Sequence, residues 1–239
     1  MRRLALFARP PEPGRVKTRL APALTPGLAL ELYRAMLADA LEQGARVADE
    51  RSVWWSGAPE PALDAGLRAW LETGGWRERI QAGSDLGVRL AAAFAELLAA
   101  RADRAVISGA DCPELDAAAL DAAFAELDRS DAVLGPTADG GYYLIALRRQ
   151  VPELFQDIAW STGEVLSQTL DRAQRAGLSV TLLHKLDDID RAEDVVHCAR
   201  RELERGLRQA PPQQPSALPD APRLGSHTHS ALRAFGLLP

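Results

Sequence analysis

Short apolar runs alternate with longer amphipathic segments along most of this chain. The first run, at residues 4–8, stops at a stretch rich in proline and glycine, which is typical of a buried strand entering a loop. After Pro26, apolar residues recur at helical spacing as far as about Gly44. The pattern therefore opens with a strand, a loop and a helix, and similar units follow.

Further apolar runs predict strands at 52–56, 79–82, 104–108, 131–135, 141–147 and 179–184. The remaining helical patterns predict helices at 61–72, 86–102, 116–127, 161–175 and 192–207. Pro113 and Asp116 are start signals for one of these helices, and Ser161 with Glu164 fits a capping box at another. Strands alternating with helices predict a mainly parallel sheet covered on both faces, with ligands beyond the carboxyl ends of its strands.

We expect a single α/β domain over residues 1–206. Residues 207–239 hold six of the sixteen prolines and only four charged residues. That composition predicts an extended tail outside the sheet, with a short terminal helix near 230–237.

The composition is that of a folded domain. Hydrophobic residues make up 47% of the sequence, which is enough to bury a core at this length. No apolar run approaches the roughly 20 residues of a membrane span. The two cysteines, Cys112 and Cys198, form neither a disulfide framework nor a metal-ligand spacing. We therefore expect a cytoplasmic protein that does not associate with membranes.

Charge is distributed unevenly along the sequence. The whole chain has 28 Lys plus Arg against 33 Asp plus Glu, a formal net charge of −5. Its first nineteen residues, by contrast, hold six basic side chains and one acidic side chain. Nucleic-acid binding needs many distributed cations, so this balance argues against that class and leaves a small anionic ligand near the N-terminus.

A basic loop follows the first strand. Arg9 stands at the strand end, and Gly14 is followed by Arg15, Lys17 and Arg19. Backbone amides behind a glycine turn, together with Lys and Arg, suit a di- or triphosphate. The spacing is not that of a P-loop, and an ordinary solvated basic loop fits the same residues.

Carboxylates follow two other strands. Asp111 comes directly after the strand at 104–108, and Asp188 and Asp190 follow the strand at 179–184. Oxygen ligands at such strand ends suit Mg²⁺ or Mn²⁺, which bridge to phosphate oxygens. Capping of the next helix is the alternative for each aspartate. Cys112 lacks a nearby histidine, so we do not expect a thiol nucleophile.

A glycine-rich turn lies between the strands at 131–135 and 141–147. It contains Asp139, Gly140 and Gly141, followed by Tyr142. The glycines permit close approach to a ligand, and Asp139 has the chemistry of a base or an acceptor-binding group. An aspartate in its ordinary turn position is the alternative.

Two helix starts complete the set of candidate residues. Asp85 and Gly87 stand where free amides and a carboxylate can contact a nucleobase or ribose. Trp160, Ser161 and Thr162 pair an aromatic ring with two hydroxyls, which suits an acceptor pocket but also a capped helix with a packed tryptophan.

Four motifs in this order resemble a known family. The segments at 7–22, 108–113, 136–144 and 158–162 are similar to the small bacterial GT-A-type transferases described as arsenosugar-biosynthesis-type glycosyltransferases or radical-SAM and selenodomain-associated transferases. The resemblance spans about residues 3–200. More distantly, the segments at 17–22 and 188–194 are similar to 2-phospho-lactate guanylyltransferases, which transfer a nucleotidyl group.

The resemblance implies a single-domain GT-A fold, like that of nucleotide-diphospho-sugar transferases. It implies nucleotide phosphates near Lys17 and Arg19, the base near Asp85 to Gly87, and a metal carboxylate at Asp111. This chain has Gly-Ala-Asp where many GT-A enzymes have Asp-x-Asp.

The expected partners are a nucleotide or nucleotide sugar and a small acceptor. The first hypothesis is a glycosyltransferase in which Lys17, Arg19 and a divalent ion stabilise the departing nucleoside diphosphate, while Asp139 orients the acceptor hydroxyl. The second is a nucleotidylyltransferase that releases pyrophosphate from an NTP. The third is a nucleotide-binding module without catalysis, since a fold does not guarantee activity.

Overall fold

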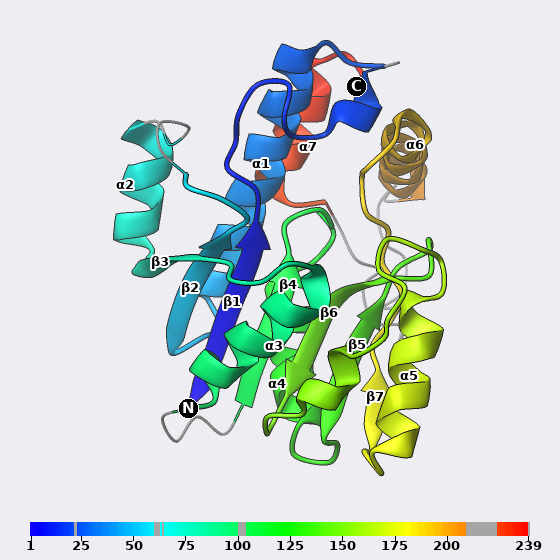
Figure 1. Cartoon of the computed structure of the whole chain (residues 1–239). Helices are drawn as coiled ribbons and strands as arrows, with labels where there is room; N and C mark the ends of the chain where they lie inside the picture. The colour runs from blue at the N-terminus through cyan, green and yellow to red at the C-terminus, as the bar shows by residue number, and fades with distance from the viewer. Residues whose placement is uncertain (22, 60–62, 64, 100–103, 209–223, 239) are drawn as a thin grey trace.

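A seven-stranded sheet forms the centre of the protein (Figure 1). The computed structural model describes all residues except 22, 60–62, 64, 100–103, 209–223 and 239. The strands are β1 (Arg2–Ala8), β2 (Glu50–Trp55), β3 (Trp76–Ile80), β4 (Arg104–Gly109), β5 (Ala132–Pro136), β6 (Tyr142–Leu147) and β7 (Val180–Leu182). Their order across the sheet is β3-β2-β1-β4-β6-β5-β7.

The sheet is mainly parallel, as expected. Only β6 runs against its neighbours, pairing antiparallel with both β4 and β5. The pairs β1–β2, β1–β4, β2–β3 and β5–β7 are parallel. The carboxyl ends of β1, β4, β5 and β7 therefore meet at one edge of the sheet, together with the turn that joins β5 to β6 (Figure 1).

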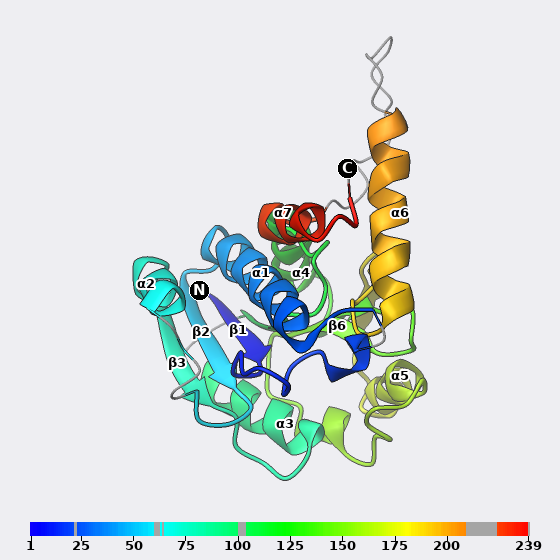
Figure 2. The same cartoon turned by 90° about the horizontal axis from the view of Figure 1, so that it is seen from above.

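Helices cover both faces of this sheet. They are α1 (Pro26–Ala45), α2 (Ala65–Thr73), α3 (Leu86–Leu97), α4 (Ala117–Glu126), α5 (Val165–Arg175), α6 (Ala192–Arg208) and α7 (Ser226–Ala234), with short 3-10 turns η1 (Thr18–Leu20) and η2 (Pro152–Phe155). In Figure 2, α1, α4 and α7 lie on one side of the sheet and α3 and α5 on the other.

Alternating side chains of the strands divide the core in two. Leu4 and Leu6 of β1 pack with α1 and α4, whereas Ala5 between them packs with α3 and η2 on the opposite face. This is the two-residue period of a strand buried on both sides. The continuous apolar run at residues 4–8 is therefore the sequence signature of a central strand.

Most expected elements are found within a few residues of their predicted bounds. Asp116 caps α4, its Oδ1 accepting a hydrogen bond from the Ala119 N–H at 2.8 Å. The strand expected at 79–82 lies earlier, at Trp76–Ile80, because it pairs along β2 from Arg51 onward. Parts of the helices expected at 61–72 and 86–102 lie outside the described residues.

The predicted capping box at Ser161 and Glu164 is wrong. Helix α5 begins later, at Val165, and Glu164 itself occupies the N-cap position without a side-chain cap bond. The Glu164 carboxylate instead accepts a hydrogen bond from the Gln168 side chain, one turn further along. Ser161 lies before the helix in a left-handed conformation, with φ 65°.

The C-terminal region contains a helix that packs on the domain. Helix α7 begins four residues before the expected start at 230 and lies along α1 (Figure 1). Thr228 and Leu232 of α7 are fully buried. The segment at 209–223, part of the expected extended tail, lies outside the described residues, and the boundary at 206 stays a prediction. None of the described helices combines the length and the apolarity that crossing a bilayer requires.

Two glycines of α1 provide a matched test of its packing. A Cβ at Gly44 would lie 2.6 Å from Leu4 Cδ2 and 2.8 Å from Trp76 Cη2, whereas one at Gly27 would meet only Thr25 Oγ1 at 4.0 Å. We expect Gly44→Ala to lower the free energy of unfolding by about 1–3 kcal/mol through overpacking. Gly27→Ala should raise it by up to about 1 kcal/mol through helix propensity. Urea unfolding measures both, and equal stability of the two variants would contradict the packing described.

Candidate functional site

Polar side chains from four connections meet at the carboxyl edge of the sheet. Lys17 comes from the loop after β1, Asp111 from the loop after β4, and Asp139 from the turn between β5 and β6. Asp188 and Asp190 come from the segment between β7 and α6. Ligands of open α/β sheets bind at this edge, so the topology brings together residues that are up to 173 positions apart in the sequence.

The ammonium group of Lys17 is the buried centre of this group. Its Nζ lies 2.7 Å from Asp111 Oδ1 and 3.5 Å from Asp190 Oδ1, and it donates a hydrogen bond to the Ile189 carbonyl oxygen at 2.5 Å. The side chain of Lys17 is only 3% exposed. The ammonium group is therefore surrounded by protein oxygens: it hydrogen-bonds the Ile189 carbonyl oxygen and Asp111, and it has the charge of Asp190 close by.

The backbone at Lys17 is also unusual. Its φ of 49° and ψ of 37° are left-handed, at the N-cap residue that directly precedes η1. A residue with a Cβ adopts this conformation at a cost of about 1–2 kcal/mol. Among the described residues, left-handed non-glycine backbone occurs only at Lys17, Asp157 and Ser161. Such conformations are often found at functional sites, where surrounding contacts hold them in place.

The pKa values of Lys17 and Asp188 are both raised in the site, for different reasons. Burial by itself lowers the pKa of Lys17, but the ion pair with Asp111 and the charges of two further aspartates outweigh burial and raise it. The pKa of Asp188 is raised to about 6, first because the carboxyl is buried and then because the Asp139 carboxylate is near. Asp111 adds to this repulsion, and Lys17 opposes it.

These carboxylates have the donor chemistry of a divalent-cation site, but within the described residues no three of them bring their oxygen atoms within 4.8 Å of one another. Asp111, Asp139, Asp188 and Asp190 bring four carboxylates to the site, against the cations of Lys17 and Arg19. The carboxylate of Asp111 is 51% exposed and that of Asp190 is 38% exposed, so both reach solvent while Lys17 lies beneath them. Excess negative charge on accessible oxygen ligands is the donor chemistry that Mg²⁺ and Mn²⁺ prefer.

The remaining cations of the basic loop are arranged differently from Lys17. Arg19 lies at the rim, with its guanidinium 3.0 Å from Asp190 Oδ2. Arg15, which follows the exposed Gly14, turns back to Glu12 at 2.7 Å. Arg9 is exposed at the end of β1. The loop thus contributes one buried cation, one at the rim and two on the outer surface.

Asp139 is held by its own turn. Its Oδ1 accepts hydrogen bonds from the Thr137 hydroxyl at 2.5 Å and from the Gly141 N–H at 3.0 Å. The next residue, Gly140, has φ 88°, and a Cβ there would lie 2.0 Å from the carbonyl oxygen of Gly163. The turn is therefore pressed against the loop before α5, and only glycine fits at that contact.

The predicted nucleoside and acceptor residues form a second group. Asp85 caps α3 by accepting from the Val88 N–H at 3.0 Å, and this bond lowers the pKa of its carboxyl. Gly87, in the first turn of α3, packs so closely on Trp160 that a Cβ would lie 2.8 Å from its Nε1. The ring of Trp160 stands edge-on to Tyr142, with centroids 6.5 Å apart.

Two hydroxyl residues follow Trp160. Thr162 Oγ1 donates to the Ala159 carbonyl oxygen at 2.7 Å, and Ser161 is exposed beside it. Among the described residues, no hydrogen bond or ion pair joins this second group to Lys17.

Several contacts around the site carry no signal in the sequence. The Tyr33 hydroxyl of α1 bonds both the N–H and the carbonyl oxygen of Arg9, each at 2.8 Å, and so secures the chain where it leaves β1. Arg201 of α6 pairs with Glu114 at 3.2 Å and with Asp187 at 2.7 Å. Helical spacing would place Tyr33 on a buried face, but nothing in the pattern identifies its partner.

Cys112 is buried next to Asp111. Burial and the nearby carboxylates of Asp188 and Asp111 raise the pKa of its thiol well above the ordinary value. A thiol that remains protonated is a poor nucleophile. This agrees with the expectation that Cys112 has no chemical role.

A sequence family matches the central part of the chain. The profile of the family described as "Uncharacterized protein conserved in bacteria (DUF2064)" matches residues 39–162, just over half of the chain. Asp111 and Asp139 lie within the matched segment, whereas Lys17 and Asp190 lie outside it. A comparison with curated proteins found no match.

Solved structures share the fold. A candidate nucleotide-diphospho-sugar transferase from Desulfovibrio desulfuricans G20 is 28% identical and has a TM-score of 0.81, with 99% of this chain and 96% of that chain covered. The 4-diphosphocytidyl-2C-methyl-D-erythritol synthase of Anaerococcus prevotii DSM 20548 is 12% identical, with a TM-score of 0.51 and coverage of 81% and 93%. The expected fold, that of nucleotide-diphospho-sugar transferases, is thereby confirmed.

Asp188→Asn should stabilise the metal-free protein at neutral pH. Because the pKa of Asp188 is raised from 3.8 to about 6 in the folded state, ionising this carboxyl opposes folding above about pH 6, and the penalty is absent below about pH 4. We expect the amide to raise the free energy of unfolding by about 1–2 kcal/mol at pH 7 and to change it little near pH 4. Urea unfolding in the presence of a chelator measures the difference.

Asp131→Asn is a control that should change the free energy of unfolding in the opposite direction. The backbone N–H and hydroxyl of Ser179 both donate to Asp131 Oδ2 and lower the pKa of this carboxyl. Its ionised form therefore stabilises the fold above its ordinary pKa, and that contribution is lost as the pH falls. Asp131→Asn should destabilise the protein at pH 7. A change of the same sign in both variants would refute the electrostatics assigned to Asp188.

Proposed function

The chain belongs to the DUF2064 family, and we propose that it is a nucleotide-dependent transferase that uses a divalent metal ion. The observation that carries this proposal is the pairing of the buried Lys17 ammonium with Asp111 and Asp190, with Asp188 near enough to raise the pKa of Lys17. The fold shared with nucleotide-diphospho-sugar transferases supports it, because such folds bind ligands at the edge where these residues meet.

The proposed metal ligands are Asp111, Asp188 and Asp190. A bound Mg²⁺ or Mn²⁺ would supply charge neutralisation for the phosphate oxygens of the nucleotide. The pKa of Asp188 is raised first by burial and then by the nearby carboxylates of Asp139 and Asp111, so a bound cation would relieve an unfavourable buried charge at Asp188. The Gly-Ala-Asp segment supplies only one carboxylate at the end of β4, so further metal ligands must come from the segment after β7. Lys17 brings the two segments together, because it contacts both Asp111 and Asp190.

We assign different tasks to the two cations. Lys17 holds Asp111 and Asp190 in place, because its buried ammonium group is ion-paired with both and hydrogen-bonds the Ile189 carbonyl oxygen. A phosphate would contact Lys17 only by replacing one of these acceptors. Arg19 at the rim is exposed and presents its guanidinium to an arriving diphosphate. Gly14, Arg9 and Arg15 would then contribute backbone amides and long-range attraction.

For the reaction itself we propose glycosyl transfer from a nucleoside-diphosphate sugar to a small acceptor. Asp139 stands exposed with one oxygen held by its turn, which suits it to orient an acceptor hydroxyl. The acceptor would lie along Gly140, Gly141, Tyr142 and the loop at 160–162, and the nucleoside near Asp85 and Gly87. The close packing of Gly87 on Trp160 supports placing the two substrates next to each other.

Nucleotidyl transfer is the second candidate. The Lys-Thr-Arg segment at 17–19 and the Asp-Ile-Asp segment at 188–190 favour it, because they resemble a family with that chemistry and they are the two segments that meet in the structure. In that reaction the same charges would stabilise the α-phosphate as pyrophosphate leaves. The metal ligands and the role of Lys17 are common to both candidates.

Asp111→Asn and Asp116→Asn form a matched pair that tests the proposal. Asp111 is a proposed ligand, whereas Asp116 caps α4 five residues later, a role that asparagine also fulfils. With Mg²⁺ and a nucleotide at 100 times its Kd, the wild-type protein should gain about 2.7 kcal/mol of stability. Asp111→Asn should lose most of this gain and at least 100-fold in turnover, and Asp116→Asn should keep both.

The released product separates the reactions. Incubation with sugar nucleotides should release a nucleoside diphosphate, whereas incubation with NTPs and an acceptor would release pyrophosphate in the second candidate. Stabilisation by NTPs alone would overturn the glycosyltransferase assignment. If the protein binds nucleotides but turns over none of the donors, both transferase reactions are rejected and a nucleotide-binding module is supported.

A further inference from the structure

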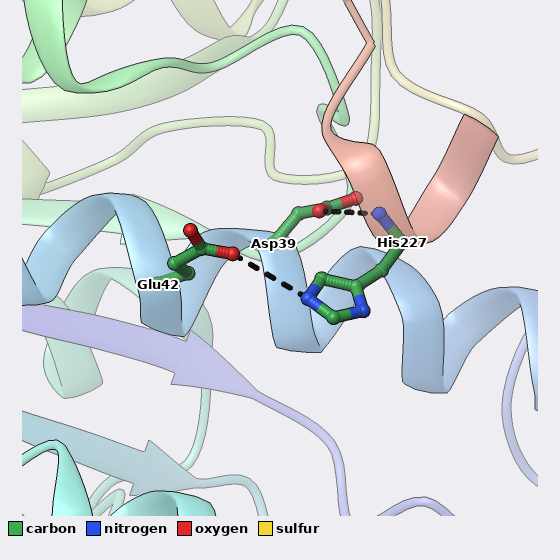
Figure 3. A group of neighbouring side chains, drawn as sticks. All are labelled: Asp39, Glu42 and His227. Atoms are coloured by element: carbon green, nitrogen blue, oxygen red, sulfur yellow. Dashed lines mark hydrogen bonds and ion pairs between the residues drawn. The ribbon is translucent and has the colours of Figure 1, made fainter. Parts of the chain in front are cut away.

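The first turn of α7 is capped by a side chain from another helix. The residue before α7 is Gly225, which has no side chain to accept from the free amides of the first turn. Asp39 of α1 does so instead: its Oδ1 accepts from the His227 N–H at 2.9 Å and its Oδ2 from the Thr228 N–H at 2.8 Å. Figure 3 shows the Asp39 carboxylate directed at the backbone nitrogen of His227.

The site is built for this contact. Asp39 is 3% exposed, so its charge requires compensation, which the amides and the positive end of the helix dipole supply. A Cβ at Gly225 would lie 2.1 Å from Asp39 Cγ. Only glycine allows the carboxylate to approach the start of α7 so closely.

The side chain of His227 adds a peripheral contact. Its Nε2 lies 3.4 Å from Glu42 Oε2 (Figure 3), and its ring stands edge-on to Trp70 at 4.8 Å. Asp39, Glu42 and His227 together offer possible metal-ligand atoms within 4.8 Å of one another. Both Asp39 oxygens already accept from backbone amides, however, which identifies the group as a helix cap.

The start of α7 also contacts the loop that carries Asp111. The Gly225 N–H donates a hydrogen bond to the Pro113 carbonyl oxygen at 2.8 Å. Pro113 is buried two residues after Asp111, and the Asp111 carbonyl oxygen accepts from the Ile189 N–H at 3.0 Å. The loop after β4 is thus held by the segment after β7 at one point and by α7 at another.

We propose that Asp39 is a positioning residue for the candidate site. By capping α7 it sets the place of Gly225, whose N–H holds the Pro113 carbonyl and so the path of the loop that presents Asp111. Asp39 itself lies on α1, away from the group around Lys17, and acts only through this chain of contacts. The functional meaning of the inference rests on the role proposed for Asp111, but the coupling between α7 and the loop does not.

Hydrogen exchange in the full-length protein tests the coupling. Asp39→Ala removes both acceptors, and Asp39→Asn keeps one acceptor oxygen. Glu42→Gln is the control, because it alters the contact with the His227 ring and leaves the cap intact. In Asp39→Ala we expect exchange to accelerate at least tenfold both in α7 and in residues 110–116, with no acceleration in β2. Asp39→Asn should give a smaller increase, and Glu42→Gln almost none.

A second readout concerns the ligand site. If the wild-type protein binds a nucleotide with Mg²⁺, Asp39→Ala should weaken that affinity at least fivefold, and Asp39→Asn should restore part of it. Exchange that accelerates in α7 alone, or equally throughout the sheet, would overturn the inference. Coupled exchange in a protein that binds no nucleotide would uphold the positioning role and reject the proposed function instead.

Gly225→Ala covers the case in which Asp39→Ala does not fold. This variant retains the carboxylate and forces it away from the first turn of α7. It should reproduce the accelerated exchange in α7 and in residues 110–116, whereas Gly27→Ala on the same helix α1 as Asp39 should not. If exchange in Gly225→Ala accelerates in α7 but stays unchanged at residues 110–116, the inference is also overturned.

Discussion

The buried ammonium of Lys17 is the interaction on which the candidate site depends. A charged group removed from water is tolerated only when it is paired and hydrogen-bonded. Lys17 meets that requirement with Asp111, Asp190 and the Ile189 carbonyl oxygen, which belong to two different connections of the sheet. Neither connection can move far without exposing or isolating this charge, so Lys17 determines how the carboxylates face solvent.

The sheet topology makes that arrangement possible. Parallel β1, β4, β5 and β7 all end at the same edge, and β6 returns between β4 and β5 so that the Asp139 turn reaches the edge as well. The polar groups gather where the strands stop, and the apolar alternation of the strands fills the two cores behind them. The apolar side chains along the strands therefore stabilise the fold, and the candidate functional residues lie beyond the carboxyl ends of the same strands.

The sequence predicted those parts of the structure that follow from periodicity and strand ends. The apolar run at 4–8 identified a strand buried on both faces, and the positions of Lys17, Asp111 and Asp190 after strands indicated that they would converge. What could not be predicted was the partner that each side chain selects. Lys17 was expected to face a phosphate, which stays a prediction, and periodicity did not indicate its contacts with Asp111, Asp190 and the Ile189 carbonyl oxygen.

Long-range contacts limited the prediction in other places too. Tyr33 and Asp39 both stand on the amphipathic helix α1, where spacing indicates burial but not that one holds Arg9 and the other caps α7. Ser161 and Glu164 have the spacing of a capping box, but the left-handed backbone at Ser161 delays the helix. Local sequence patterns do not predict the structure at positions where tertiary contacts determine the backbone conformation.

The pairing of Lys17 with Ile189 has a consequence for biosynthesis. The two residues are separated by 172 positions, so the N-terminal loop emerges from the ribosome long before its acceptors do. Contacts of such sequence separation form late, because the entropy of closing the loop opposes them until the rest of the chain has collapsed. The sheet around β1 and β2 can assemble early, but the carboxylate cluster cannot form until residues 188–190 have been synthesised.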